Sequence, residues 1–236
     1  MNRFSYYPPI LGYHRVGRFQ GDHVPTISVE TFEHQLTFLA RSRYRVVGLE
    51  EIVSCLSRRQ SIPRRSVVIT FDDGYEETHE VAWPLLKRFG FPATVFVAPA
   101  EVGWPGFATW EQVAAMARDG LVIGCHTMHH TYLPLLGADR LPEELVESKR
   151  VIEERIGRPV TLLSYPVGGF TLQVQSAVQQ AGYLAACTTN RASWHPGIDP
   201  YALRRIKVTE RDSNPILFWA KVSGYYDLFR RLREPA

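Results

Sequence analysis

Two short segments of this sequence have the residue types and spacing of a hydrolytic metal site. One is the pair Asp72 and Asp73 in the stretch VVITFDDGYEE, and the other is HTMHH, which begins at His126 and ends at His130. The two outer histidines are four residues apart, so a helical turn or a tight loop can direct both imidazoles to one point. Two imidazoles and one carboxylate are usual ligands of a divalent metal and leave coordination positions open for hydrolysis. The second aspartate is then free to act as a base on a water whose pKa the metal lowers.

Each segment alone also has an ordinary structural explanation. Adjacent aspartates before a glycine are common in turns, and an HxxxH pair often lies on a surface. His129, at the i+3 position, is an alternative ligand to His130. Cys125, beside His126, has the type of a thiol nucleophile, but a small buried residue that ends a strand explains it better. The metal-site interpretation therefore depends on where the two segments lie in the fold.

Short apolar runs rich in β-branched residues alternate with helical patterns along the whole chain. Ser28 is a candidate helix cap, Thr109 and Gln112 form a candidate capping box, and Gly90, Gly120, Gly157 and Gly182 stand where helices should end. Buried strands that alternate with helices predict a parallel sheet covered by helices, and this number of units favours a barrel over an open sheet. Eight strands are expected, at residues 9–13, 44–48, 66–71, 93–98, 121–125, 160–165, 183–188 and 203–208.

The polar segments follow the expected strands at their carboxyl ends. His14 comes after the first strand, Asp72 and Asp73 after the third, His126 after the fifth, and SYPVGG after the sixth. In a parallel α/β barrel these ends share one face, which is where such folds carry their active sites. The convergence of four strand ends predicts an active site more strongly than any single residue does.

Composition sets outer limits on the function. The chain has 236 residues, 45% of them hydrophobic and 22% charged, as expected for one α/β domain with a full core. A net charge of +3 is too small to indicate nucleic-acid binding. Three dispersed cysteines, Cys55, Cys125 and Cys187, form no CxxC pair and predict neither disulfides nor a thiolate zinc site. The start MNRFSYYPPILGYHRV lacks the apolar run of a signal peptide, and no later run is long enough to span a membrane, so a cytoplasmic protein is expected.

The motifs resemble those of the polysaccharide deacetylase family, also called the NodB-homology domain or carbohydrate esterase family 4. Its first motif, TFDDG, is present unchanged from Thr70 to Gly74, and its second, H-[ST]-x-x-H, is present as HTMHH. FGFPATVFV, TWEQV and LRRIKV extend the similarity over nearly all of residues 1–236. The resemblance implies a single domain folded as a distorted (β/α)7 barrel, in which a metal-dependent reaction removes an acyl group, most often N-acetyl on an amino sugar.

The resemblance also implies roles for individual residues. Asp72 would be the catalytic base, and Asp73, His126 and His130 would hold one divalent metal ion, with Zn²⁺ as the default. The family's third motif, which resembles RxPYG, reads SYPVG here, so the backbone N–H of Val167 is the candidate donor to the oxyanion.

The third motif departs from the family pattern. Its arginine, which orients the base in the family, is replaced by Ser164, and its aromatic position is taken by Val167. The SYPxG form resembles the branch that includes exopolysaccharide poly-N-acetylglucosamine deacetylases, where an arginine after a late strand takes the orienting role. Arg205 in LRRIKV fits that role, and Arg204 is its rival.

Other roles follow from the same resemblance or from residue type. The leaving amine needs a general acid; His14 resembles the histidine that the exopolysaccharide branch uses, and His195 in SWHPG is the alternative. Tyr165, Trp110 and Trp194 are candidates for lining a sugar-binding cleft, and a packing role is the alternative for the tryptophans.

The C-terminal residues 214–236 predict an amphipathic helix. Apolar and aromatic residues fall on one helical stripe, and basic residues supply positive charge: Phe218, Val222, Tyr225, Phe229 and Leu232, with Lys221, Arg230, Arg231 and Arg233. Such a helix can lie on an anionic membrane surface, although one that packs across the barrel has the same pattern. Membrane contact would make a lipid-linked sugar a plausible substrate.

The sequence thus predicts a metal-dependent carbohydrate N-deacetylase acting on an acetylated glycan. One alternative is a deformylase or deacylase of a lipid-linked sugar or another small amide, with the same site and a different cleft. A second is a glycan-binding protein that has lost catalysis, which the missing arginine of the third motif suggests. Activity on lipid-linked but not polymeric sugars would favour the first alternative, and metal binding without hydrolysis would favour the second.

Overall fold

The computed structural model describes residues 8–17, 24–190 and 199–224. Ten strands are present in this part of the chain: β1 (Ile10–Tyr13), β2 (Arg15–Val16), β3 (Thr26–Ile27), β4 (Arg45–Val46), β5 (Ser66–Phe71), β6 (Thr94–Val97), β7 (Val122–Cys125), β8 (Leu162–Ser164), β9 (Ala185–Thr188) and β10 (Leu203–Lys207). All eight strands expected from the sequence are among them. The additional pair, β2 and β3, has two residues in each strand, too few to give a periodic signal.

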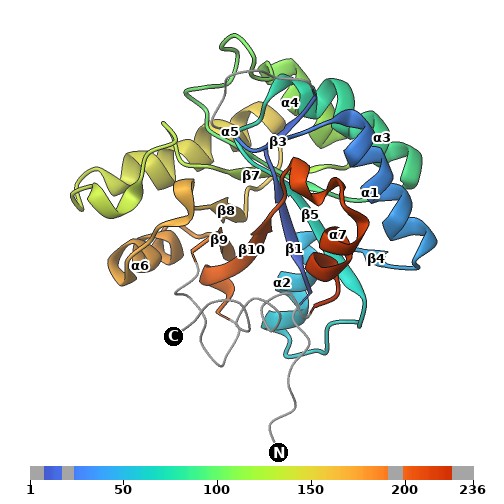
Figure 1. Cartoon of the computed structure of the whole chain (residues 1–236). Helices are drawn as coiled ribbons and strands as arrows, with labels where there is room; N and C mark the ends of the chain where they lie inside the picture. The colour runs from blue at the N-terminus through green and yellow to red at the C-terminus, as the bar shows by residue number, and fades with distance from the viewer. Residues whose placement is uncertain (1–7, 18–23, 191–198, 225–236) are drawn as a thin grey trace, which may run out of the picture.

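Seven parallel strands close into a barrel (Figure 1). Their order is β1-β10-β9-β8-β7-β6-β5, and β1 pairs again with β5 to complete the ring. The eighth expected strand, β4, pairs with the first residues of β5 outside this ring. The expected (β/α)7 barrel in one domain is confirmed.

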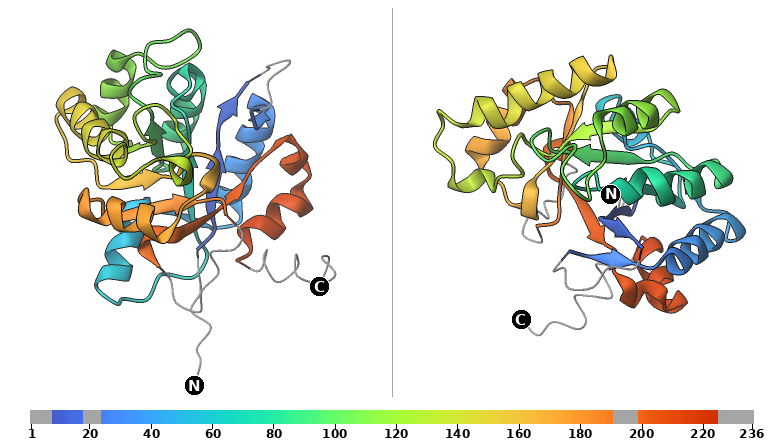
Figure 2. Two further views of the ribbon diagram at one scale, coloured as in Figure 1. Left: turned by 90° about the vertical axis from the view of Figure 1, so that its left-hand side faces the viewer. Right: turned by 90° about the horizontal axis from the view of Figure 1, so that it is seen from above.

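Helices cover the outside of the barrel, as the views in Figure 2 show. The α-helices are α1 (Val29–Arg41), α2 (Leu49–Ser57), α3 (Trp83–Phe89), α4 (Trp110–Arg118), α5 (Ser148–Ile156), α6 (Leu172–Gln180) and α7 (Pro215–Val222). Short turns of π-helix span Thr78–Ala82 and Glu143–Glu147, and 3-10 turns span Leu133–Leu135, Pro166–Gly168, Pro200–Ala202 and Glu210–Ser213. The expected caps form: Ser28 accepts the N–H of Thr31, Thr109 and Gln112 form the capping box, and Gly90 and Gly157 end helices in left-handed conformation.

Strand residues alternate between two hydrophobic clusters, as the period of two in a strand requires. In β5, Val67, Ile69 and Phe71 belong to the cluster under the helices, whereas Val68 belongs to the cluster inside the barrel. Leu49, Ile52 and Val53 of α2 share this inner cluster with residues at the strand starts. Helix α2 therefore closes the amino-terminal end of the barrel, and the carboxyl ends of the strands remain for the site.

The described part of the expected C-terminal helix is α7, and its stripe faces the core. Phe218 and Val222 are buried, and the Phe218 ring lies edge-to-face with Phe38 of α1 at 5.7 Å. Lys221 is buried as well and donates to Asp212 at 2.7 Å, so its charge is neutralised inside the protein and is not presented to a membrane. The remaining predicted stripe and basic residues, from Tyr225 onward, lie outside the described residues. No helix in the described ranges has both the length and the apolar character needed to cross a bilayer.

Candidate active site

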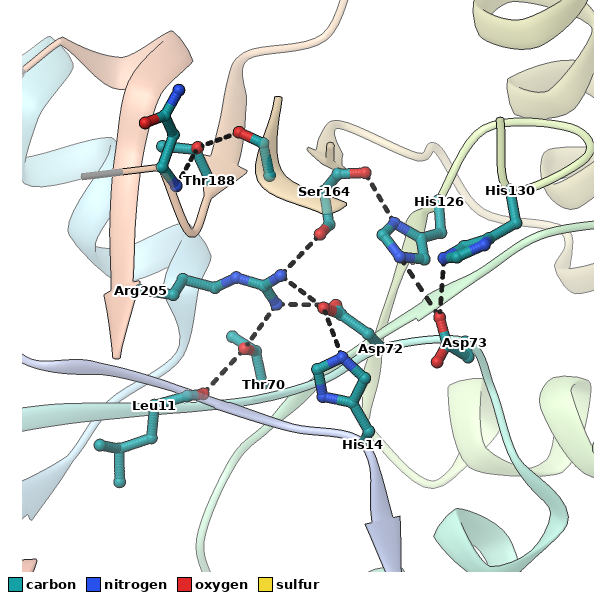
Figure 3. Close-up of polar contacts among 12 residues, drawn as sticks. Leu11, His14, Thr70, Asp72, Asp73, His126, His130, Ser164, Thr188 and Arg205 are labelled. Carbon is teal, nitrogen blue, oxygen red and sulfur yellow. Dashed lines mark hydrogen bonds and ion pairs between the residues drawn. The ribbon is translucent and has the colours of Figure 1, made fainter. Parts of the chain in front are cut away.

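The strand residues that point into the barrel are followed, at the carboxyl ends of the strands, by polar side chains that point the same way. Asp72 extends the inward series Val68 and Thr70 of β5, and His126 extends that of β7 in the same way. In β10 the inward series includes Leu203 and Arg205, while Arg204 has the opposite register. The inward series of β8 ends at Ser164, and His14 continues that of β1. Alternation therefore brings His14, Asp72, His126, Ser164 and Arg205 into one interior layer (Figure 3).

Asp73 and the two histidines form a compact group beside this layer. The Nε2 atoms of His126 and His130 lie 3.4 and 3.3 Å from Oδ1 of Asp73, and the ligand atoms of all three lie within 4.8 Å of one another. For a tetrahedral ion with bonds of about 2.0–2.1 Å, neighbouring ligand atoms are separated by about 3.3 Å, which the two measured distances match. The three expected ligands are thus brought together.

The hydrogen bonding of the group also fits a cation. Nδ1 of His126 lies 2.7 Å from the carbonyl oxygen of Ser164, which can only accept, so this nitrogen carries the proton and Nε2 presents its lone pair. Oδ1 of Asp73 is buried, yet among the described residues it has no hydrogen-bond partner. A buried carboxylate oxygen without a donor is costly unless a cation neutralises it. Burial raises the pKa of Asp73, but the adjacent imidazoles outweigh burial and hold that pKa well below its usual range.

Left-handed backbone is concentrated in the segments that carry this site. Asp73, Thr127, His130 and Val167 have φ values of 69°, 67°, 54° and 58°. Such conformations cost of order 1–3 kcal/mol each and persist where surrounding structure enforces them, often at active sites. The left-handed turn at Asp73 ends the strand alternation. Asp72 therefore contacts Arg205, while the adjacent Asp73 lies beside His126 and His130.

Asp72 is held by Arg205, as expected for the orienting arginine. The guanidinium donates to both carboxylate oxygens, from Nη1 at 2.7 Å and from Nη2 at 2.5 Å, and both side chains are buried. The same guanidinium donates to Ser164 Oγ at 2.8 Å and to Thr70 Oγ1 at 3.1 Å. Ser164, which stands where the family motif has arginine, therefore anchors the arginine that reaches Asp72 from β10. Burial raises the pKa of Asp72, but the positive charge of Arg205 and its hydrogen bonds, with His126 and His14, lower it overall.

His14 lies on the other side of Asp72. Its Nε2 is 3.9 Å from Asp72 Oδ2, and its Nδ1 is buried without a hydrogen-bond partner among the described residues. Burial lowers the pKa of His14 from 6.5, and the nearby Asp72 and Asp73 only partly oppose this effect. The imidazole is therefore close to Asp72 and is neutral at pH 7.

The turn that carries Val167 is held by a hydrogen bond from Thr188 of β9. Val167 is left-handed with its side chain 76% exposed, and Thr188 Oγ1 donates to the carbonyl of the next residue, Gly168, at 2.5 Å. Figure 3 labels Thr188 above Arg205. A β-branched residue at positive φ is unusual, and here the conformation sets the direction of the backbone N–H.

Other sequence-predicted residues have different surroundings. Tyr165 is an outward residue with 1% exposure, and its hydroxyl donates to the carbonyl of Tyr201 at 3.0 Å, so its side chain is part of the core and offers no surface to a sugar. Trp110 packs against Arg155 in the outer helix layer, with 5.5 Å between the guanidinium carbon and the ring centroid. His129, the alternative ligand, places Nδ1 2.9 Å from Glu144 and not among the three ligands. Trp194 and His195 lie outside the described residues.

Sequence reasoning missed Thr70 and Glu144. Thr70 lies two residues before Asp72 in the inward register, which was a readable signal for its contact with Arg205. Glu144 contacts the HTMHH loop from a helical turn 14 residues beyond His130, and no motif or spacing in the sequence points to it.

Comparison with known proteins shows which family the chain resembles. The family model for polysaccharide deacetylase matches residues 59–186. A Bacillus subtilis (strain 168) protein, YxkH, whose name describes it as a polysaccharide deacetylase, is 30% identical over 85% of this chain and 71% of its own. A poly-beta-1,6-N-acetyl-D-glucosamine N-deacetylase of Staphylococcus aureus (strain MRSA252) is 23% identical over 78% of this chain and 68% of its own.

Solved structures show the same fold. The structure of IcaB from Ammonifex degensii superposes with a TM-score of 0.78 at 30% identity, over 90% of this chain and 96% of that one. The Streptococcus pyogenes deacetylase PplD gives a TM-score of 0.81 at 23% identity, over 89% and 98%. The chain belongs to the polysaccharide deacetylase family, with the barrel and the motifs that the family implies.

Proposed function

We propose that this protein is a metal-dependent hydrolase that removes N-acetyl groups from a glycan containing amino sugars. The observation that carries the proposal is the pairing of two clusters: Asp73, His126 and His130 converge on one point, and Asp72 is held beside them by Arg205. Membership of the polysaccharide deacetylase family supports the reaction class. The S. aureus relative is named for poly-beta-1,6-N-acetyl-D-glucosamine, so that polymer is the first substrate to test.

The three candidate ligands would hold one divalent ion, and Zn²⁺ suits their nitrogen and oxygen donors. When bound, this ion would polarise the acyl carbonyl and acidify water. The ligand set contains no thiolate, and its imidazole-carboxylate composition also suits other hydrolytic ions.

The chain's own residues would move the protons. Asp72 stays ionised because Arg205 lowers its pKa, and it takes a proton from the attacking water. The backbone N–H of Val167 would donate to the oxyanion that forms on the substrate. His14 starts neutral, 3.9 Å from Asp72, so it can receive the proton from Asp72 and deliver it to the leaving amine. Water supplies the hydroxyl of the released acetate and the proton of the amine, so the step is balanced.

The position of Arg205 weakens the reason for considering an inactive binding protein. That alternative was based on the missing arginine of the third motif, and Arg205 makes the bidentate contact with Asp72 that an orienting arginine provides. Three exposed apolar residues on α7, Ile216, Leu217 and Trp219, would support peripheral membrane contact, and with it a lipid-linked substrate.

The test is release of acetate and formate by protein reconstituted with Zn²⁺. The substrates are N-acetylated oligosaccharides, including β-1,6-linked N-acetylglucosamine, and lipid-linked sugars. Wild type should release acetate from the oligosaccharides, and Asp72→Asn should lower kcat about 10²–10⁴-fold with unchanged metal content. Formate from a lipid-linked sugar alone would establish the deacylase alternative, and no release by metal-loaded wild type would contradict the hydrolase proposal.

A further inference from the structure

The loop from His126 to His130 has a strained backbone for its length. Thr127 and His130 are both left-handed, with φ of 67° and 54°, and one of them is β-branched. A short loop with two such residues needs contacts that enforce its shape, because each left-handed residue costs of order 1–3 kcal/mol. One internal contact is present: Thr127 Oγ1 accepts the N–H of Thr131 at 3.2 Å.

The backbone N–H of Ala100 also donates to the carbonyl of Met128 at 3.0 Å, and the remaining side-chain contacts come from Glu144. Its Oε2 accepts the backbone N–H of Met128 at 2.9 Å and of His129 at 3.1 Å. Its Oε1 lies 2.9 Å from Nδ1 of His129 and accepts the hydroxyl of Thr131 at 3.3 Å. One carboxylate therefore contacts the residues on both sides of His130 without contacting His130 itself.

Glu144 is rigidly placed. It is 2% exposed, and glutamate is almost never this buried unless it is paired. It lies in the π-helical turn Glu143–Glu147, and its backbone carbonyl accepts Ser148 Oγ at 2.6 Å. Ser148 Oγ is also 3.1 Å from Cys125 Sγ, at the end of β7. The carboxylate is thus tied to the strand that carries His126 and to the loop that carries His130.

We propose that Glu144 is a positioning residue for the metal site: it clamps the loop so that His130 stays directed at Asp73. This inference rests on the metal site proposed above. Its contacts are with the loop backbone and with the neighbours of His130, so it acts on the geometry of one ligand and not on the reacting atoms. Residues that orient metal ligands typically contribute about 10- to 100-fold to metal affinity.

The experiment measures Zn²⁺ affinity of the metal-stripped protein by competition with a chelating dye, with thermal unfolding of the metal-free protein alongside. The variants are Glu144→Gln and Glu144→Ala, and the matched control is Glu147→Gln. Glu147 is on the same helical turn but half-exposed, and it pairs with Arg150 on the surface. His129→Ala is added because it removes one side-chain contact of Glu144 and leaves the two backbone contacts.

Glu144→Ala should weaken Zn²⁺ binding about 10- to 100-fold. Glu144→Gln, which has the same size and keeps one acceptor oxygen, should weaken it less and so provide partial rescue. Glu147→Gln should bind like wild type, and His129→Ala should lose only a few-fold. At saturating Zn²⁺, Glu144→Gln should recover most of the wild-type kcat, which a general structural defect would not allow.

Three outcomes would overturn the proposal. If both Glu144 variants fold and bind Zn²⁺ with wild-type affinity, the loop keeps its shape without Glu144. A larger loss in His129→Ala than in Glu144→Ala would make His129 a ligand. A Glu144→Gln protein whose kcat stays low at full occupancy would show that Glu144 acts elsewhere. Absence of Zn²⁺ binding by wild type is a separate result, because it would contradict the metal site itself.

Discussion

The candidate ligand group, formed by Asp73, His126 and His130, lies beside the cluster around Asp72, but the chain builds the two differently. Asp73, His126 and His130 come from two loops inside the segment matched by the family model, and left-handed turns place two of them. Asp72 is held by Arg205, 133 residues away in sequence and outside that segment. Local motifs therefore specify the candidate ligands, whereas closure of the barrel, which pairs β1 with both β5 and β10, brings Arg205 to Asp72.

The two clusters also differ energetically. Oδ1 of Asp73 has no hydrogen-bond partner among the described residues, so the ligand group adds little to stability until a cation binds. Asp72 and Arg205 form a buried, bidentate pair whose guanidinium also donates to two hydroxyls, and removing one partner of such a pair is strongly destabilising. Variants of the first cluster should lose function alone, and variants of the second should lose stability as well.

The largest effect on activity is expected for His130→Ala. Its side chain is one-third exposed, so its removal disturbs the core little. Loss of a ligand removes several kcal/mol of transition-state stabilisation, so kcat/KM should fall by about 10³ or more. The free energy of unfolding of the metal-free protein should change by less than about 1 kcal/mol. Metal analysis, kinetics and denaturant unfolding check this, and a large loss of metal-free stability would contradict the comparison.

The sequence predicts the parts of the fold and site that depend on local patterns, and it does not predict the parts that depend on closure of the barrel. The strands at 66–71 and 121–125 and their inward register predict where Asp72 and His126 lie, because alternation is a local property. The choice between Arg205 and Arg204 depends on the register of β10 against β1, which only the closed barrel fixes. Glu144 was not predicted, because a glutamate in a helical turn has no signal that distinguishes a buried clamp from a surface charge.

The next largest effect is expected for His14→Phe, which keeps the ring volume and removes the proton carrier. kcat should fall about 10²–10³-fold, the usual contribution of a proton-transferring side chain. Wild-type kcat/KM should rise with pH through the pKa of His14, which burial lowers from 6.5, and then stay level through neutrality, because the neutral imidazole is the form that accepts the proton.

The pH profile is measured at saturating metal, so that proton competition at the ligands does not contribute. In His14→Phe the acid limb that the titration of His14 causes should disappear. Activity that instead falls as pH rises from 6 to 8 would mean that His14 must start protonated, and the proton would then not come from Asp72.

Arg205→Lys tests whether the second cluster needs the planar guanidinium. Lysine keeps the charge, but its single nitrogen cannot reproduce the planar fork in which two nitrogens each donate to one oxygen of Asp72. We expect kcat to fall about 10- to 100-fold, since a misplaced base is costly. Arg205→Met should lower the free energy of unfolding by about 3–5 kcal/mol at pH 7, because Asp72 is left as an unpaired buried charge.

The stability difference for Arg205→Met should shrink in acid. The pKa of Asp72 is lowered in the folded protein, so its pairing stabilises above the unfolded pKa of about 3.9 and this contribution is lost as pH falls through the folded pKa. Denaturant unfolding at pH 7 and at about pH 3, below the unfolded pKa of Asp72, measures both values. Equal destabilisation at the two pH values would show that packing, not charge, dominates at this site.

The smallest effect is expected for Gly168→Ala, in the turn that directs the Val167 N–H. Gly168 has φ of +78°, and a Cβ there would lie 2.2 Å from Thr189 Oγ1 and 2.7 Å from its backbone nitrogen, which cannot rotate away. The turn must shift, and we expect kcat to fall about tenfold through misalignment of the oxyanion donor. Gly90→Ala is the control, because Gly90 has φ of +66° and no atom within 4 Å of the added carbon. Both variants carry the left-handed strain, and only Gly168→Ala adds the close contacts with Thr189. A kcat defect in Gly168→Ala alone would support an oxyanion donor in this turn, and wild-type kcat in both variants would contradict it.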